Sequence, residues 1–391
     1  MRRIAFIVSH PIQYYAPLHQ QLAQVEDVQI KVFFTWHDAS SAVQDAGFKR
    51  AVAWDIPLTS GYDFELVPNV APEPGTHHFF GLRNPTLVSR VLAWQPDVVH
   101  ITGWAWASHL WALRAFHRLG IPTLFRGDSH LLDAVQSGPR WWLKKIVLSR
   151  IFSWVSVCLY VGQANRAYYE AFGVPSGRLH YCPHSIDVAR FAEPTALYEQ
   201  DAVAWRHGLG IKDDAIVLLF AGKFEPKKQP LRLMQAFING APEHAILIML
   251  GNGELESQIT SLAAAHPARF RMLPFQNQSK MPVVYRLGDF FVLPSAWGET
   301  WGLSVNEALA CGRPVLVSDR VGCAADVVLP TGGNFGTVFQ SSEPDGLRNA
   351  IERVCNGPTM PRNVLTKRAW AFDIGQTAHT LLTAVNNIKQ L

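Results

Sequence analysis

The chain has 391 residues, which is longer than a typical single domain and predicts two domains of roughly 150–200 residues each. Its composition, 48% hydrophobic and 17% charged, excludes an intrinsically disordered chain. The net charge of +4 favours anionic ligands slightly, and the absence of any basic run excludes a nucleic-acid-binding tail, so we expect no nucleic-acid partner.

The cysteine spacing and the lengths of the apolar runs predict the cellular compartment of the protein. No two cysteines have the CxxC spacing of a zinc or redox site, so we expect buried thiols in a reducing cytoplasm and no metal site. The apolar stretch of five residues in the N-terminal MRRIAFIV is too short for a signal peptide. No apolar stretch approaches the roughly 18–20 residues that cross a bilayer, and we therefore expect a cytoplasmic protein. The cysteines are Cys158, Cys182, Cys311, Cys323 and Cys355.

The first half of the chain alternates short apolar runs with segments of helical spacing, a pattern typical of a parallel sheet covered by helices. Residues 36–80, rich in proline, glycine and aromatic residues, are predicted to be irregular. The predicted strands are residues 4–8, 28–34, 97–101, 123–126, 155–161 and 179–183, and the predicted helices are residues 16–24, 85–94, 105–119, 138–153 and 163–172.

Polar and aromatic residues follow several of these predicted strands. Loops at the carboxyl ends of parallel strands are where such sheets bind ligands. Two residues keep a second interpretation open, because His10 also suits a structural turn and Asp128 also suits a turn or helix cap. The candidates for ligand contact are His10 and Gln13 in HPIQYY, Trp104 after Gly103, and Arg126, Asp128 and His130 in RGDSH.

Residues 139–153 mix aromatic, basic and apolar side chains, as in RWWLKKIVLSRIF. One interpretation is a helix packed on the first sheet with its lysines and arginines in water. The other is an interfacial helix that contacts a membrane surface, because tryptophan and lysine favour the headgroup level of a bilayer.

The second half repeats the alternation and predicts a second parallel sheet, with the boundary between domains near residues 185–200. The predicted strands are residues 216–222, 245–250, 270–273 and 289–293, with a further strand from 314, and the predicted helices are residues 230–237, 255–265, 302–310, 343–355 and 363–389.

The most informative segment is 289–317, a predicted strand–loop–helix–strand unit. Gly302 stands at the predicted helix start, where free amides and the helix dipole form a natural pyrophosphate seat. Glu307 lies about four residues inside the helix, roughly 6 Å along its axis, which suits a ribose attached to the pyrophosphate. Glu299 precedes the seat, where a sugar beyond the second phosphate would lie. The alternative for both glutamates is ordinary solvated charge.

A second loop carries lysines directly after the predicted strand 216–222. Lys223 and Lys228 follow Gly222, and Lys227 lies beside them. Because loops at the carboxyl edge of a doubly wound sheet converge, these lysines are expected to approach the same pyrophosphate and to neutralise it without a metal ion. The alternative for each lysine is a solvent-facing position.

The segment ETWGLSVNEALACGRPVLVSD, with Glu299 and Glu307 separated by seven residues, resembles the signature of the retaining glycosyltransferases of family 4. The resemblance implies an α/β chain with the GT-B fold, two Rossmann-like doubly wound domains that face each other across a cleft. Residues 1–187 would form the acceptor-side domain, residues 188–365 the nucleotide-sugar-binding domain, and residues 366–391 a helix that crosses back to the first domain.

The resemblance also assigns roles to residues. It implies that Glu299 contacts the donor sugar, that Glu307 holds the ribose, and that Lys223 and Lys228 stabilise the leaving diphosphate. Many family members carry a histidine where this chain has Asp128, which makes Asp128 a fourth catalytic candidate. The donor-binding candidates are Gly222, Gly302, Leu303, Glu307, Leu273 and Phe275, the last two beside the base, and the acceptor candidates are His10, Gln13, Trp104, Arg126 and His130.

The expected activity is transfer of a hexosyl group from a nucleotide-sugar to an acceptor hydroxyl, with retention, in bacterial envelope polysaccharide or glycolipid synthesis. The acceptor would be a carbohydrate or a lipid-linked molecule, and the protein could lie peripherally at the inner face of the membrane through residues 139–153. Because no Asp-x-Asp motif is present, we expect no metal or other cofactor. The alternatives are a non-catalytic nucleotide-sugar-binding protein and a GT-B-type nucleotide-sugar epimerase.

Overall fold

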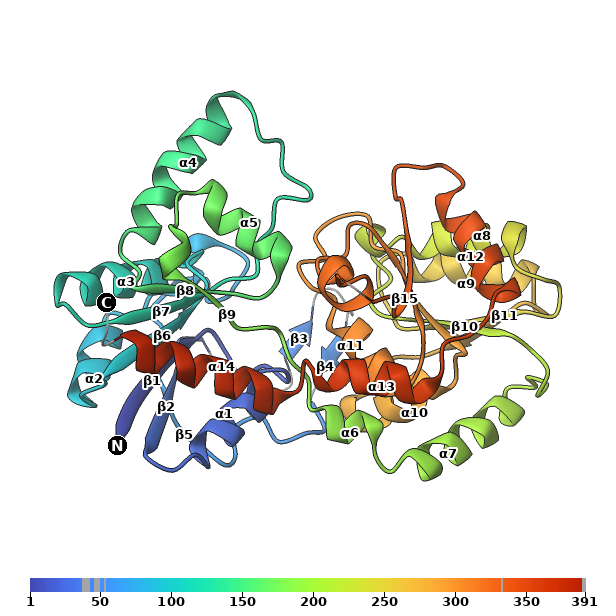
Figure 1. Cartoon of the computed structure of the whole chain (residues 1–391), viewed down its shortest axis with the longest axis horizontal. Coiled ribbons are helices and arrows are strands. Elements are labelled where there is room, and N and C mark those ends of the chain that lie inside the picture. Colours follow the sequence, from blue (N-terminus) through green and yellow to red (C-terminus); the bar gives the residue numbers. More distant parts are fainter. Residues whose placement is uncertain (37–42, 46–49, 53, 332, 389–391) are drawn as a thin grey trace. The chain divides into compact units, whose positions relative to one another are not determined.

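The computed structural model describes residues 1–36, 43–45, 50–52, 54–331 and 333–388 (Figure 1). The chain divides into two compact units, which we describe separately. Unit 1 comprises Met1–Ser41, Ile56–His184 and Ile374–Leu391, and unit 2 comprises Ala42–Asp55 and Ser185–Asp373. The first domain was predicted to end at residue 187, and unit 1 leaves off at His184. The chain was predicted to return to the first domain after residue 365, and it returns to unit 1 at Ile374.

Unit 1 is built on a seven-stranded parallel sheet, in which the strand order reverses between its first strand, β1, and β6. Alternate residues of β1 feed two different apolar cores, one containing Ile4, Phe6 and Val8 and the other Ala5 and Ile7. The order is β5 (Asp63–Leu66), β2 (Val28–Phe34), β1 (Arg2–Val8), β6 (Val98–Thr102), β7 (Thr123–Arg126), β8 (Val157–Tyr160) and β9 (Leu179–Tyr181).

Strand β5 corrects the prediction that residues 36–80 are irregular. It pairs with β2 at the edge of the sheet, and its Phe64 and Leu66 are exposed. An edge strand with no buried run lacks the apolar alternation by which strands are recognised. Other residues of the segment, 37–42, 46–49 and 53, lie outside the described residues. The pair β3 (Val43–Asp45) and β4 (Arg50–Val52) is antiparallel and is grouped with unit 2.

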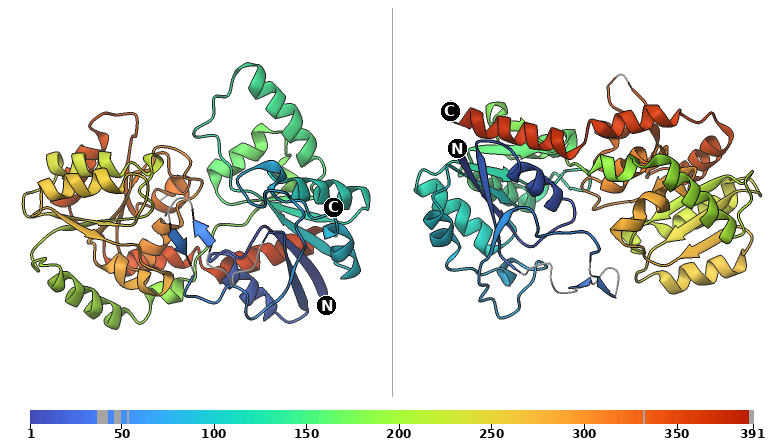
Figure 2. Two further views of the ribbon diagram at one scale, coloured as in Figure 1. Left: turned by 180° about the vertical axis from the view of Figure 1, so that it is seen from behind. Right: turned by 90° about the horizontal axis from the view of Figure 1, so that it is seen from below.

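Helices cover both faces of the unit 1 sheet, as the two views of Figure 2 show. Helices α1 (Ala16–Ala23) and α14 (Ile374–Asn387) pack on one face, where Leu22 and Leu381 are fully buried. The other face carries α2 (Leu87–Ala93), α3 (Ala107–Arg118), α4 (Gly138–Phe152) and α5 (Gln163–Ala171). The predicted C-terminal helical region is interrupted between Trp370 and Ile374, which leaves α13 (Arg362–Trp370) in unit 2.

Unit 2 holds a six-stranded parallel sheet with strand order 3-2-1-4-5-6 within the unit, the order of a doubly wound dinucleotide-binding fold. The order is β12 (Phe270–Leu273), β11 (Ile246–Leu250), β10 (Val217–Ala221), β13 (Phe290–Leu293), β14 (Val315–Ser318) and β15 (Gly336–Phe339). The order therefore reverses between β10 and β13.

The helices of unit 2 include three that the sequence did not reveal. Of these, α7 has only Ala202 fully buried, so its apolar face is too weak to be recognised. The missed helices are α6 (Val188–Ala192), α7 (Thr195–Gly208) and α10 (Met281–Arg286). The others are α8 (Pro230–Gly240), α9 (Glu256–Ala265), α11 (Leu303–Ala310), α12 (Gly346–Asn356) and α13. Within the described ranges, none of the chain's helices has the length and apolar content needed to cross a bilayer.

Candidate functional site

Three loops meet at the carboxyl edge of the unit 2 sheet. The loop after β10 and the loop after β13 are joined by a hydrogen bond from the Ala296 amide to the Lys227 carbonyl, at 2.8 Å. The loop after β11 packs so closely that a Cβ atom added to Gly251 would overlap the carbonyl oxygen of Gly222. The Phe224 amide, in turn, donates to the Asn252 carbonyl at 2.9 Å. This contact of backbone on backbone fixes the loops at the point where the strand order reverses, which is where such sheets bind ligands.

Lys228 and Glu299 form an ion pair across two of these loops. The Lys228 ammonium donates to Glu299 Oε2, and both side chains are largely buried. The Ser295 hydroxyl donates to the same carboxylate oxygen at 3.0 Å, and the Ser318 hydroxyl holds the Ser295 carbonyl. Because a lysine ammonium has three N–H donors, Lys228 can hold Glu299 and still donate to a phosphate.

The two other lysines of the loop differ from Lys228. Lys227 is 40% exposed and pairs with Glu225 at 3.2 Å, so it has the solvent-facing position that the sequence left open. Lys223 is half-buried one residue after Gly222, and its carbonyl accepts from the Glu225 amide at 2.9 Å.

Gly302 begins helix α11 in a left-handed conformation, with φ of 95°. A Cβ atom there would lie 2.9 Å from Val321 Cγ1 and 3.0 Å from Leu293 Cδ2, so glycine alone fits. No side chain of the described residues caps this helix start. The Val305 amide already donates to the Gly302 carbonyl at 2.9 Å. The amides of Leu303 and Ser304, at the start of α11, are therefore the ones available to an anion, and the helix dipole favours negative charge there.

The backbone before Gly302 is also hydrogen-bonded to the segment that follows β14. The Gly322 amide donates to the Glu299 carbonyl and the Cys323 amide to the Trp301 carbonyl, both at 3.0 Å. A side chain at Gly322 would overlap the Thr300 carbonyl, so the two segments approach as closely as backbones allow. The segment between Glu299 and α11 is thus positioned before any ligand arrives.

Glu307 is the buried carboxylate of the site. It is 2% exposed, and its Oε2 accepts from the Tyr285 hydroxyl at 2.5 Å. Burial raises the pKa of Glu307 to about 7, although the Tyr285 hydroxyl and the positive charge of Arg190 oppose that rise. Its second oxygen, Oε1, has no hydrogen-bond partner among the described residues. A buried acceptor without a donor is rare, and a ligand hydroxyl would satisfy it.

Leu273 ends β12, and Phe275 lies in the loop that follows it. The Phe275 amide donates to the Asn252 side chain at 3.1 Å, so its N–H is already engaged within the protein. Tyr285, Ser295 and Arg190, which support the two glutamates, were not identified from the sequence. Ser295 lies two residues after β13, and that position was the one available signal for it.

The remaining candidates lie in unit 1, at the carboxyl edge of its own sheet. His10 Nδ1 is 2.9 Å from the Ser9 hydroxyl, and the His10 ring packs edge-on against Trp36 at 5.2 Å between centroids. Gln13 is partly exposed in the same loop, and Trp104 packs against the apolar core of the unit.

Arg126 is buried, and its guanidinium group bonds to other residues of unit 1 instead of facing an acceptor. Its terminal nitrogens donate to the Cys182 thiol at 3.1 Å and to the Pro183 carbonyl at 2.9 Å. Asp128 is half-exposed and lies 3.8 Å from His184 Nε2. His130 Nδ1 accepts from the Leu132 amide at 3.2 Å, whereas its Nε2 is buried without a partner among the described residues.

Two family models match the chain, one to each unit. The model described as "Glycosyl transferases group 1" matches residues 201–369, and the model described as "Glycosyl transferase 4-like domain" matches residues 59–184. A D-inositol 3-phosphate glycosyltransferase of Geodermatophilus obscurus is 28% identical over 228 residues, which are 55% of this chain and 48% of that protein. A second, from Catenulispora acidiphila, is 31% identical over 242 residues, 56% of this chain and 54% of that protein. The matched part thus spans about half the length of these relatives.

Solved structures resemble the chain over nearly its full length. Anabaena Alr3699/HepE in complex with UDP and glucose has a TM-score of 0.67 and 16% identity, with coverage of 99% of this chain and 100% of that one. The sucrose-phosphate synthase of Thermosynechococcus elongatus has a TM-score of 0.71 and 19% identity, with full coverage of both chains. At these identities the likeness shows the fold.

The paired Rossmann-like units and the family matches define a glycosyltransferase with the GT-B fold. The match of one glycosyltransferase model to each unit confirms the resemblance to the family 4 type found in the sequence.

Proposed function

We propose that the protein is a retaining hexosyltransferase that moves a sugar from a nucleoside-diphosphate donor to an acceptor hydroxyl. The observation that carries the proposal is the buried Glu307, whose free Oε1 lies on the same helix as the uncapped start at Gly302. One helix therefore offers amides to a diphosphate and, about one turn further on, a carboxylate oxygen to the vicinal hydroxyls of a ribose.

The Lys228–Glu299 pair supplies the chemistry at the other side of this seat. Lys228 donates to the leaving diphosphate as its negative charge grows, and Lys223 adds a second positive charge in the same loop. Glu299, positioned by Ser295, accepts from a hydroxyl of the donor sugar and orients it for transfer. These roles need no metal ion. Among the described residues, no group of three His, Cys, Asp or Glu side chains lies together as a metal site would require.

The relatives indicate which substrates to try. Solved structures similar to this chain contain UDP, UDP-glucose or ADP, which supports a nucleoside-diphosphate sugar as donor. Sequence relatives are named for a phosphorylated inositol, and two structural neighbours for lipopolysaccharide synthesis. We infer a polyhydroxylated or lipid-linked acceptor in envelope synthesis, contacted by His10, Gln13, Trp104, Asp128 and His130 of unit 1.

The direct test is turnover by purified protein with UDP-, GDP-, ADP- and dTDP-sugars. We expect release of the nucleoside diphosphate from one of them, at a rate unchanged by EDTA, because the amides and lysines replace a metal at the diphosphate. Product anomeric configuration, read by NMR, should match the donor. Loss of turnover with EDTA and recovery with Mg²⁺ would contradict metal independence.

The same assay separates the alternatives. A non-catalytic binding protein would be stabilised by a nucleotide-sugar and would release no nucleoside diphosphate. An epimerase would change the configuration of the sugar without needing an acceptor. The intact Lys228–Glu299 pair favours transfer over both.

Helix α4 supports a peripheral position at a membrane surface. Its C-terminal half is anchored in the core of unit 1 through Leu148, Ile151 and Phe152. In its N-terminal half, Trp141 packs against Phe172, whereas Trp142, Leu143 and Ile146 on the other side of the helix are 62–67% exposed. Figures 1 and 2 show this half projecting from the unit. Residues 138–153 contain four cations and no acidic residue, so we propose contact with an anionic lipid surface.

Replacing both Leu143 and Ile146 with serine should weaken binding to vesicles that contain an anionic phospholipid by at least about tenfold. Two apolar side chains of this size contribute roughly 1.5–3 kcal/mol each when they leave water. Co-sedimentation with vesicles measures the effect. The control is the serine variant of Leu329, an exposed leucine in unit 2, which should bind as the wild type does. Equal binding by the double variant would refute the proposal.

A further inference from the structure

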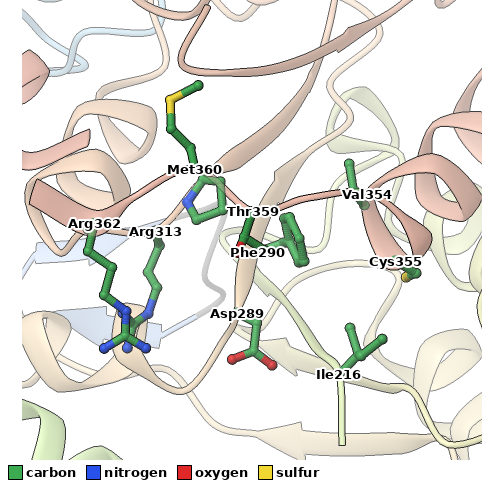
Figure 3. Close-up of a pocket in the computed structure, with 12 residues that line it drawn as sticks. Ile216, Asp289, Phe290, Arg313, Val354, Cys355, Thr359, Met360 and Arg362 are labelled. Atoms are coloured by element: carbon green, nitrogen blue, oxygen red, sulfur yellow. The ribbon is translucent and has the colours of Figure 1, made fainter. Parts of the chain in front are cut away.

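A cavity of about 260 Å³ lies in unit 2 at the end of the sheet opposite to the candidate site. Its lining includes Ile216 and Asp289, which immediately precede β10 and β13, and Arg313, which lies two residues before β14. Residues from Val354 to Arg362 complete the lining (Figure 3). The donor seat begins where β13 ends, whereas the cavity lies where β13 begins, so the two are separate places in the fold.

Positive charge is in excess beside this cavity. Glu199 of α7 is shared by three guanidinium groups, those of Arg286 at 3.3 Å, Arg313 at 2.7 Å and Arg362 at 3.3 Å. The carboxylate that lines the cavity, Asp289, is held by Arg206 at 3.1 Å and by the Val217 amide at 2.8 Å. One carboxylate therefore faces three cations, and two of these, Arg286 and Arg313, are buried. Buried positive charge that exceeds the negative charge beside it is costly unless a further anion is present.

Arg313 has unused hydrogen-bonding capacity. It is 3% exposed, and its Nε and Nη1 have no partner among the described residues. Buried guanidinium nitrogens are normally paired. Arg362, by contrast, is 63% exposed and forms the solvent side of the group. Figure 3 shows the guanidinium groups of Arg313 and Arg362 side by side, consistent with their shared contact with Glu199 Oε2.

We propose that this cavity is a binding site for a small molecule that bears a phosphate or carboxylate group. Two adjacent guanidinium groups match the planar, two-pronged recognition that both oxyanions favour. The lining also includes Ile216, Cys355 and Met360, which would receive an apolar part of the same molecule. The site differs from the donor seat in using arginine side chains instead of helix amides and lysines.

Cys355 provides a local test. All five cysteines are described, four are buried, and Cys355 alone is partly accessible and lines the cavity. Its alkylation by iodoacetamide, followed by mass spectrometry, should slow when inorganic phosphate replaces chloride at equal ionic strength. At a phosphate concentration ten times Kd, protection should be about tenfold. A parallel series with acetate distinguishes a phosphate site from a carboxylate site.

Matched variants decide the outcome. Protection should persist in Lys228→Ala, which alters the donor seat, and in Arg353→Gln, which removes an exposed cation from the same helix as Cys355. It should be lost in Arg313→Met and in Arg362→Gln, and the latter keeps the test valid if the buried substitution prevents folding. Unchanged alkylation with phosphate and acetate, or protection that survives in Arg362→Gln, would overturn the proposal.

Discussion

Replacing Lys228 with alanine should lower kcat by about 10²-fold, because removal of one preorganised donor to a developing charge typically costs that much. The ammonium already lies against Glu299 in a largely buried position, so it is in place before the donor binds. Steady-state kinetics with the donor identified by the substrate screen measures the change. Lys228→Arg, which keeps the charge, should recover part of the rate.

Lys227→Ala is the matched control for this variant. Lys227 is the neighbouring residue of the same loop, but it is paired with Glu225 and faces solvent. We expect its kcat to stay within about twofold of the wild type, because an exposed ion pair contributes roughly 0–1 kcal/mol. Thermal unfolding of both variants tests whether either loses its fold. A folded Lys228→Ala enzyme with near-normal kcat would remove Lys228 from the mechanism.

Replacing Glu307 with glutamine should weaken donor binding about 10- to 100-fold, because a charged acceptor contributes about 1.5–3 kcal/mol to a hydrogen bond. The same change should stabilise the protein without ligand at neutral pH. In the folded protein the pKa of Glu307 is raised from 4.5 to about 7, so the unfolded chain ionises first as the pH rises. The folded state therefore loses stability between about pH 4.5 and 7, by up to roughly 3 kcal/mol.

Two measurements on Glu307→Gln follow from that sign. The first is the free energy of unfolding without donor. In the wild type it should fall between pH 5 and pH 8 as Glu307 ionises, and in the variant this part of the fall should be absent. Donor affinity of the wild type should fall below pH 7, as the carboxyl group is protonated and can no longer accept from two hydroxyls, whereas the variant should lack this dependence. Equal stability profiles for the two proteins would show that Glu307 is not the titrating group.

Much of the local structure around the candidate site in unit 2 could be predicted because its signals are local. A buried strand, a glycine and a helix start follow one another within 289–310, and the glutamates occur at fixed steps from that glycine. The burial of Glu307, its bond to Tyr285 and its raised pKa could not be predicted, because Tyr285 lies 22 residues away on a helix that the pattern did not reveal. Such contacts depend on tertiary packing, which periodicity does not encode.

Unit 1 shows the opposite case, in which a local signal was ambiguous. Arg126 ends a strand and begins a polar loop, and the same sequence suits a side chain turned to a ligand or one turned inward. The structure turns it inward, toward Cys182 and Pro183 of a segment some 56 residues later. The edge strand β5 was missed for a related reason, since exposure on both faces removes the alternation that marks a strand.

The membership of α14 in unit 1 bears on how that unit could be produced in isolation. Ile374, Leu381 and Val385 fill the same core as β1 and β2, and the Thr377 hydroxyl is bonded to the Pro183 carbonyl at 3.1 Å. A recombinant fragment that stops at residue 184 would expose the apolar face of the sheet that α14 covers, and it should aggregate. Soluble expression of the first unit calls for residues 374–388 to be supplied as well, either fused through a linker or added as a separate peptide.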